Sequence, residues 1–434
     1  MHRARQRIPA SRRKGATSNV IYRSILHIGD EWVRALLVEV RPENVLTIGV
    51  GKERRIDRGP AIKAATLASV CEDALRRAED MTERTVGYLV VPDEAIVSIP
   101  GLYVHSVIGR VQMVRSQPER EIGQRELLRL LSRLYDTTEH LAAVATVHKS
   151  GSASTVSSSS FEFLQAKVIE MRVDGYEVTM PIRFRGSKLE AAAVALFAEA
   201  PFMDELRLLM TYLELAPTAV ATSWAIASCM NEQEALGLVL DSHETTLFLL
   251  RRGTVVALER CAFGGEELAR DLAVALGLPR FRTDALQDAH RQGELDEKQI
   301  GQLEEGMRYS ARQWLQSLNG ALSRIAEQNP LPHRLCFWEM FPGFPALEQI
   351  LRGWMETWPL DRFPVVRKVG LKDIPGISER TGVAGGDRGI SHDPEDAAAF
   401  ALAHYAGGLQ EALRPLDDLF YRAATSARHG AWFG

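Results

Sequence analysis

The chain has 434 residues, of which 46% are hydrophobic and 25% charged, with a formal net charge of −4. This length allows two or three well-packed domains, and the charge excludes a global nucleic-acid-binding signature. No run of about 20 apolar residues occurs, which excludes a membrane-spanning helix. The four cysteines are scattered without a CxxC pair, which excludes that kind of zinc site and indicates reduced core residues of a cytoplasmic protein.

Residues 1–19 predict a basic, disordered tail. Residues 1–29 contain no acidic side chain but several arginines, and so few apolar residues cannot bury a core. Weak attraction to anionic lipid is the alternative, followed by nucleic-acid contact or an organellar presequence. No apolar segment follows the basic residues, so a secretory signal is excluded.

Residues 20–94 predict the first part of an α/β lobe. Three apolar runs before residue 51 indicate a strand meander, and an amphipathic helix is expected at 61–79. Its apolar face consists of Leu67, Val70, Ala74 and Leu75. The run VGYLVV at 86–91 predicts a buried strand that completes the layer.

Residues 95–175 predict a small α+β module inserted into this lobe. Alternating apolar residues at 95–114 indicate antiparallel strands, and 120–136 indicates a helix. The helix carries a stripe of Leu127, Leu130, Leu131 and Leu134. A Ser/Gly-rich loop at 150–160 separates it from further strands at 161–178.

The remaining chain predicts a second lobe built on the same plan as the first. Residues 176–230 return to the first lobe, with helices expected at 202–215 and 218–230. Residues 231–386 form the second lobe, which begins with a hairpin at 237–258 and continues with helices at 265–278 and 296–327. Residues 387–408 supply a closing helix for the first lobe, capped by Asp393 ahead of Pro394.

The segment at 239–265 has the outline of a phosphate-binding hairpin. An apolar strand ends in Asp241, a polar turn leads through Thr245 and Thr246 into a second strand, and the segment closes at Gly264 and Gly265. Glycines are needed in such turns because the backbone must approach the phosphates closely. The turn instead holds Ser242, His243 and Glu244.

The order of elements, together with VDGYEVTMPIRFRGSKLEA at 173–191, resembles the FtsA family of bacterial cell-division proteins. This resemblance covers most of residues 20–408. It implies an α/β actin-like fold, a duplicated ribonuclease-H-like architecture of two lobes with a small inserted subdomain of the SHS2 type. It also implies tethering of the tubulin homologue FtsZ at the inner membrane, self-association into actin-like protofilaments, and a C-terminal amphipathic anchor.

The resemblance assigns nucleotide-binding positions residue by residue. In the first phosphate loop, D-I-G-T-x-x-V-K of the family is His27-Ile28-Gly29-Asp30-Glu31-Trp32-Val33-Arg34 here. The second phosphate loop of the family is the glycine-rich D-I-G-G-G-T-T-D. The equivalent turn of this chain is one residue shorter and contains no glycine. Asp284 and Gln287 stand where the family has Glu and Lys. The implied site residues are Gly29, Asp30, Asp241, Thr245, Thr246, Gly264, Gly265, Asp284 and Gln287.

Residues 409–434 form a C-terminal tail that is a candidate membrane-associating helix. Its apolar side chains are Leu416, Leu419, Phe420, Trp432 and Phe433. Membrane-surface helices combine such residues with a basic face, which is modest here. A helix packed on the body, or a frayed end, is the alternative.

Three functional hypotheses follow. The first is an FtsA-like scaffold that is not an enzyme, has no cofactor or binds ATP and magnesium only weakly, and organises FtsZ or another divisome protein at the membrane. The second is an active, ATP-binding FtsA that polymerises. The third is a platform protein of pilus or secretion assembly, of the PilM type. No catalytic residue or metal site is predicted, and no nucleic-acid partner is expected.

Overall fold

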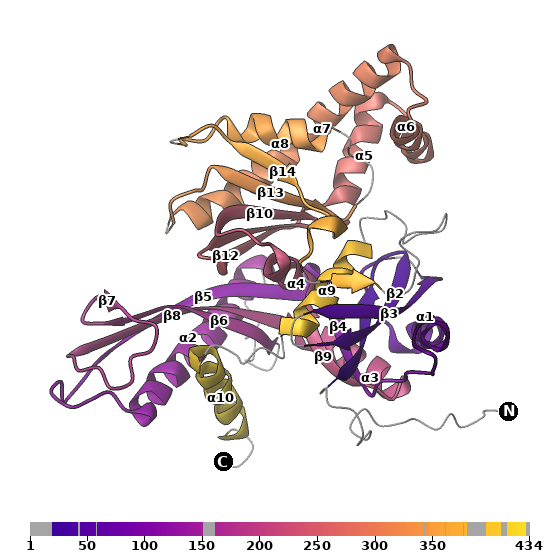
Figure 1. Ribbon diagram of the computed structural model, residues 1–434. Coiled ribbons are helices and arrows are strands. Elements are labelled where there is room, and N and C mark those ends of the chain that lie inside the picture. The colour runs from indigo at the N-terminus through magenta and orange to yellow at the C-terminus, as the bar shows by residue number, and fades with distance from the viewer. Residues whose placement is uncertain are drawn as a thin grey trace.

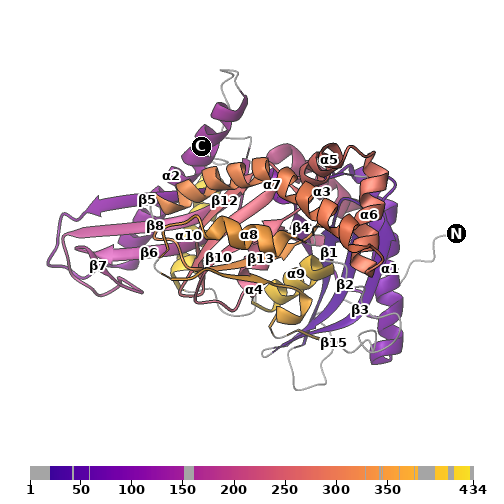
Figure 2. The same ribbon diagram turned by 90° about the horizontal axis from the view of Figure 1, so that it is seen from above.

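The computed structural model describes residues 20–41, 44–57, 59–150, 161–327, 329–341, 344, 346–360, 362–375, 377–379, 396–408 and 415–430. Three β-sheets organise this part of the chain (Figure 1). Two of them belong to the predicted lobes, and the third forms an inserted subdomain that extends away from the first lobe in both views (Figure 2).

The first lobe is built on a sheet with the strand order β15-β3-β2-β1-β4-β9. Its strands are β1 (Ile21–Ile28), β2 (Trp32–Val40), β3 (Val45–Arg54), β4 (Glu94–Ile99), β9 (Ala216–Ala221) and β15 (Ile377–Glu379). The first three form an antiparallel meander, while β4 joins β1 in parallel. Helices α1 (Ala64–Val86) and α3 (Ala200–Tyr212) pack together, with α1 on β2 and β3. Helices α4 (Thr222–Cys229) and α9 (Asp396–Gly408) pack together on the side toward the second lobe (Figure 1).

The second lobe repeats this topology. Its sheet has the order β12-β11-β10-β13-β14, with a meander of three strands followed by two parallel strands. The strands are β10 (Glu234–Leu240), β11 (Thr245–Arg251), β12 (Thr254–Cys261), β13 (Arg334–Glu339) and β14 (Val365–Lys368). The helices are α5 (Gly265–Leu276), α6 (Arg280–Gln292), α7 (Glu297–Ala326) and α8 (Leu347–Met355). The predicted duplication is therefore confirmed.

The inserted subdomain is a sheet with the order β5-β8-β6-β7, covered by helix α2 (Gln124–Ser150). Its strands are β5 (Val104–Val114), β6 (Phe161–Val173), β7 (Tyr176–Glu177) and β8 (Lys188–Glu199). Because β8 lies between β5 and β6, this subdomain continues to Glu199, beyond the end at 175 that we expected. The sequence of β8 does not show this role, because its small apolar side chains are buried on both faces of the sheet and so do not alternate with polar ones.

Two local predictions are wrong. Residues 86–91 do not form a strand, because α1 keeps its buried face through Thr82 and ends only at Gly87, which has a left-handed φ of 84°. The strand comes later, as β4, and lies in the first lobe. Likewise, 218–230 is not one helix, because Ala216–Ala221 pairs with β4 as β9 before α4 begins.

The amphipathic patterns of the long helices are confirmed. Leu67 and Ala74 of α1 are fully buried, and Val70 and Leu75 nearly so. The four leucines of the α2 stripe are fully buried as well. All four cysteines lie in the described ranges, and each is buried with a free thiol. No helix among the described residues is long and apolar enough to cross a membrane.

Candidate functional site

The predicted phosphate loops face each other across the contact between the two lobes. The first is the turn after β1, at Gly29 to Glu31, and the second is the turn after β10, at Asp241 to Glu244. The N-terminus of α5 closes the third side, because Gly265 N donates to Asp241 O at 2.8 Å. The structure therefore brings together seven of the nine predicted site residues.

An ion pair joins the two turns directly. His243 Nε2 of the second lobe lies 3.0 Å from Asp30 Oδ2 of the first. Asp30 stands at the position where the resemblance to FtsA predicted a contact with phosphate, and its carboxylate places a negative charge there. Arg55 supports the first turn by donating to the carbonyl oxygen of Gly29 at 2.8 Å.

Burial and pairing shift the acid–base properties of this turn. The hydrogen bond that His243 donates to Asp30 raises the pKa of His243 against the opposing effect of burial. Burial acts to raise the pKa of Asp30, but His243 and Ser242 outweigh it and hold that pKa below its usual value. Asp241 accepts a hydrogen bond from Ser242 N at 2.7 Å, but burial, with the nearby charge of Asp30, outweighs it and raises the pKa of Asp241 to about 6.

Glu244 fills the space that a glycine would leave open in a phosphate loop. Its side chain is buried against Gly101, where an added Cβ would lie 2.9 Å from Glu244 Cδ. Arg260 of β12 donates to Gly101 O at 2.9 Å and to Leu102 O, and its guanidinium lies 3.4 Å from Glu244. Burial raises the pKa of Glu244 to about 8, although Arg260 lowers it. Glu244 and Arg260 thus pin the second lobe to the segment after β4.

The N-terminus of α5 already has its hydrogen-bond acceptors. Gly265 N donates to Asp241 O, Glu266 N to Ser242 O at 2.8 Å, and Gly264 N to Glu267 Oε2 at 3.0 Å. Free N–H groups at a helix N-terminus are what an anion binds. Gly264 is needed here for contact within the protein, since a Cβ would lie 2.5 Å from Ser242 O and 2.6 Å from Asp241 O.

The other predicted positions also have structural partners. Thr245 Oγ1 donates to Phe263 O and accepts from Trp314 Nε1, both at 2.8 Å. Thr246 is buried and hydrogen-bonds Glu244. Gly265 lies under Phe341, whose Cβ would be 2.5 Å from a Cβ added at the glycine.

The two predicted residues of α6 do not face this site as ligands. Asp284 accepts from Arg280 Nε at 2.7 Å, and the same arginine lies 3.0 Å from Glu266. Gln287 is buried in α6. The leading position of the first loop, His27, is also buried, with its Nδ1 3.0 Å from Ser98 Oγ.

These residues do not fit a nucleotide and its metal ion. The position between the turns is taken by the His243–Asp30 pair, the helix N–H groups bond the turn, and Phe341 covers Gly265. Within the described ranges, no three His, Cys, Asp or Glu side chains are grouped to hold a metal ion. The sequence indicated that the residues of the second turn are unsuited to a phosphate loop. Arg260, Gly101 and Phe341 carried no signal, because their roles depend on contacts between segments far apart in the chain.

The C-terminal helix α10 (Pro415–Gly430) packs on the inserted subdomain. Leu416, Leu419 and Phe420 are 9%, 6% and 1% exposed and contact the core formed by α2 and β6. These three side chains, which we expected to face a membrane, are therefore not on the surface. They pack against the inserted subdomain of the same chain instead. Trp432 and Phe433 lie outside the described residues.

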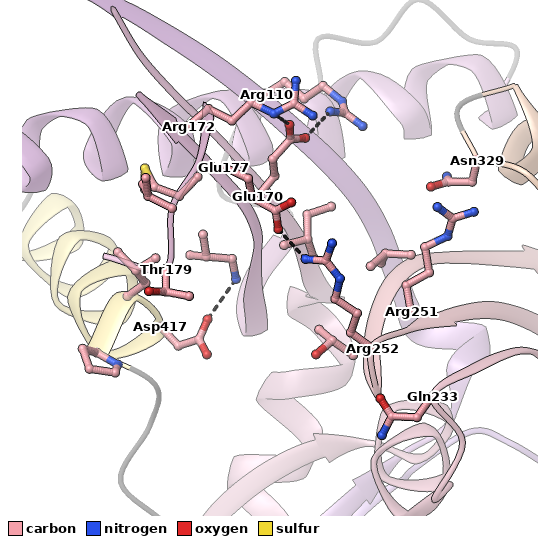
Figure 3. A pocket seen from close by; sticks show the side chains of 18 of the residues that line it. Arg110, Glu170, Arg172, Glu177, Thr179, Gln233, Arg251, Arg252, Asn329 and Asp417 are labelled. Carbon is pink, nitrogen blue, oxygen red and sulfur yellow. Dashed lines mark hydrogen bonds and ion pairs between the residues drawn. The ribbon is translucent and has the colours of Figure 1, made fainter. Parts of the chain in front are cut away.

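Two cavities lie away from the turns. One, of about 1100 Å³, lies between the inserted subdomain, the β11–β12 hairpin and the first turn of α10 (Figure 3). Its charged side chains pair with one another, with Glu170 between Arg110 and Arg172, and Glu177 2.7 Å from Arg252. The other, of about 760 Å³, is a groove between α5, α6 and α7 that is lined by both apolar and polar side chains.

Comparisons with known proteins establish the fold. No protein-family model matches the chain, and no curated protein sequence matches it significantly. Among solved structures, the chain is similar to the PilM-PilN type IV pilus biogenesis complex, with a TM-score of 0.56 and 13% identity over 88% of this chain and 97% of that one.

Two further structures share the fold more distantly. The ethanolamine utilization protein EutJ from Carboxydothermus hydrogenoformans has a TM-score of 0.42 and 9% identity over 88% of this chain and 89% of that one. The ROK hexokinase from Thermus thermophilus has a TM-score of 0.39 and 13% identity over 90% of this chain and 100% of that one. The duplicated sheets and the similarity to the PilM-PilN structure agree with the actin-like α/β fold that the sequence predicted.

Proposed function

We propose that this chain is a scaffold protein that uses an actin-like fold without ATP turnover. The observation that carries this proposal is the ion pair between His243 and Asp30, at the position where relatives hold phosphates. A nucleotide would have to break this pair, displace the turn from α5 and bring its charge against Asp30 and Asp241. Each of these steps costs free energy.

A scaffold acts by holding other proteins, and the groove between α5, α6 and α7 suits that role. Val274 and Tyr309 on its wall are 72% and 55% exposed, and Phe281 nearby is 69% exposed. Exposed aromatic and aliphatic side chains around a groove favour the docking of an apolar segment. We propose that a short apolar segment of a partner protein binds there, and that the chain also self-associates as actin-like proteins do.

Two partner classes are in view, and a specific observation favours each. The segment VDGYEVTMPIRFRG resembles the FtsA signature, which favours FtsZ or another divisome protein at the cytoplasmic face of the membrane. The structural similarity to PilM favours a PilN-like partner in pilus or secretion assembly. The runner-up, an ATP-driven FtsA, would need the clasped turns to open.

Binding of labelled peptides tests the scaffold and separates the two partner classes. The probes are the C-terminal tail of FtsZ and the N-terminal segment of PilN, titrated against the full chain by fluorescence anisotropy. We expect one peptide to bind, and Tyr309→Ala to weaken it by about tenfold, the cost of losing one aromatic anchor. Tyr212→Ala is the matched control, because Tyr212 is 54% exposed on α3 in the other lobe.

Each outcome has a clear meaning. Binding of the FtsZ tail alone supports the cell-division role, and binding of the PilN segment alone ends it in favour of a pilus or secretion platform. Binding of neither peptide, or equal loss in both tyrosine variants, would contradict the proposed scaffold and its groove.

A further inference from the structure

Three titratable side chains occur within the four-residue turn after β10. Asp241, His243 and Glu244 all meet the interface between the lobes, and each is part of the second lobe. Solvent-exposed turns carry such residues without consequence, whereas here Glu244 is buried, Asp241 is half-buried and His243 is paired. A closed interface of this kind must respond to protons.

The contacts across the interface come from two points of the first lobe. His243 pairs with Asp30 in the turn after β1. Glu244, with Arg260 beside it, rests on Gly101 and Leu102, just after β4. These points lie at the ends of neighbouring parallel strands, so the turn spans the top of the first-lobe sheet.

We propose that the turn Asp241–Glu244 is a proton-dependent clasp, which holds the two lobes together when His243 is charged and Glu244 is neutral. The clasp opens as pH rises, because both residues then lose the proton that suits the closed arrangement. This inference rests on the proposed function in one respect: if no nucleotide moves the lobes, another process must open them.

The charged and titratable surroundings favour the proton on His243 but act in opposite directions on Glu244, where Asp241 favours the proton and Arg260 opposes it. His243 faces Asp30 from the first lobe, Asp241 from its own turn and Glu267 from α5, all of which favour its protonated form. Glu244 faces Arg260 from β12 and Asp241 from its own turn. The remaining neighbours that sense these charges are Arg55, Tyr103 and Cys261.

The sign of the pH effect follows from proton linkage. The closed arrangement raises the pKa of His243, so the favourable contribution of this residue is present at low pH and is lost as pH rises through the raised value. Closure also raises the pKa of Glu244 to about 8 and of Asp241 to about 6. Both carboxyls therefore bind protons more tightly when closed, and they too disfavour closure as pH rises. Asp30 opposes this only in acid, where protonation would remove its charge.

The distance between the lobes is the quantity to measure. Spin labels on Glu83→Cys of α1 and Gln316→Cys of α7 report this distance by double electron–electron resonance. Both positions are exposed and can therefore be labelled. The four native cysteines are buried with raised pKa values, which protects them from labelling. We expect one short distance at about pH 6, and a longer population at about pH 8.5 that changes the closed-to-open ratio by about tenfold or more, the effect of one pKa unit in one group.

Two variants must act in opposite directions. His243→Asn removes the charge and should open the lobes already at about pH 6, while Glu244→Gln mimics the protonated acid and should keep them closed at about pH 8.5. Asp30→Asn should behave as His243→Asn does, and serves in its place if that variant does not fold. His140→Asn, at an exposed position of α2, should behave as the parent chain does.

A distance distribution that does not change with pH in the folded parent chain would overturn the clasp. So would equal responses of His243→Asn and Glu244→Gln. This failure is distinguishable from failure of the proposed function, because peptide and ATP binding are measured separately. A chain that binds neither peptide can still open with pH, and a chain without pH response can still bind a partner.

Discussion

His243 Nε2 lies 3.0 Å from Asp30 Oδ2, which joins the turn after β10 to the turn after β1. These are equivalent turns in the two halves of a duplicated fold. In an actin-like ATPase they approach each other through the phosphates of a nucleotide, whereas here they meet through their own side chains. The two turns that the fold brings together are thus joined by an internal contact between the lobes.

Gly264→Ala should destabilise the chain, because its Cβ would meet the backbone of the turn, 2.5 Å from Ser242 O and 2.6 Å from Asp241 O. Backbone cannot move aside as a side chain can, so we expect a loss of roughly 1–3 kcal/mol in the free energy of unfolding. Urea denaturation followed by circular dichroism measures it. Gly123→Ala is the control, since Gly123 also precedes a helix but has nothing within 4 Å. Equal losses in the two variants would show that the turn does not pack on α5.

Phe420→Ala should cost about 3–5 kcal/mol of unfolding free energy, as for other buried aromatic residues. Phe420 is 1% exposed and lies edge-on to Tyr135 of α2, with ring centroids 6.4 Å apart. Thr425→Ala, at an exposed position of the same helix, should change stability little. A small effect of Phe420→Ala in thermal or urea unfolding would mean that α10 does not stay docked on the inserted subdomain.

The buried ion pair between Arg34 of β2 and Asp396 of α9 should be sensitive to loss of one partner. Arg34→Met leaves the aspartate without its main partner, for which we expect a loss of about 3–5 kcal/mol. Arg422→Met breaks the exposed pair with Asp418 and should cost about 1 kcal/mol or less. If calorimetric melting shows similar losses for both, α9 does not close the first lobe as described.

Glu244→Gln should remove part of the pH dependence of stability. Burial raises the pKa of Glu244 from its ordinary value to about 8, so the folded state binds this proton more tightly than the unfolded state. The parent chain therefore loses stability as pH rises above about 4.5 toward 8, whereas the glutamine variant does not lose this contribution. Unfolding free energies at several pH values should converge in acid and diverge near pH 8. Glu72→Gln, exposed on α1, should follow the parent chain throughout.

The sequence predicted the fold well where local patterns decide structure. The leucine stripe of α2 and the apolar face of α1 follow a helical period, and the meanders of both lobes follow from short apolar runs divided by turns. The sequence was a poor guide at Ala216–Ala221, because strand pairing with the distant β4 overrides local propensity, and at 86–91, because α1 continues to Val86.

For the site, the sequence allowed us to predict which residues are missing but not which contacts replace them. Ser242, His243 and Glu244 in place of glycines predicted that this turn lacks the usual chemistry of a phosphate loop. What those residues do instead depends on Asp30 and Gly101, which lie far away in the chain, and on Arg260 of β12, all of which meet them only after folding. Similarly, the apolar face of α10 was visible, but the sequence could not distinguish a membrane from α2 as its partner.

Titration of the full chain with ATP and magnesium by isothermal calorimetry tests the central claim most directly. The account predicts no binding heat up to millimolar ATP, because the clasped turns, the bonded N-terminus of α5 and Phe341 leave the phosphates no site. Micromolar affinity in the parent chain, lost in Asp241→Ala, would contradict it and would restore an ATP-dependent protein.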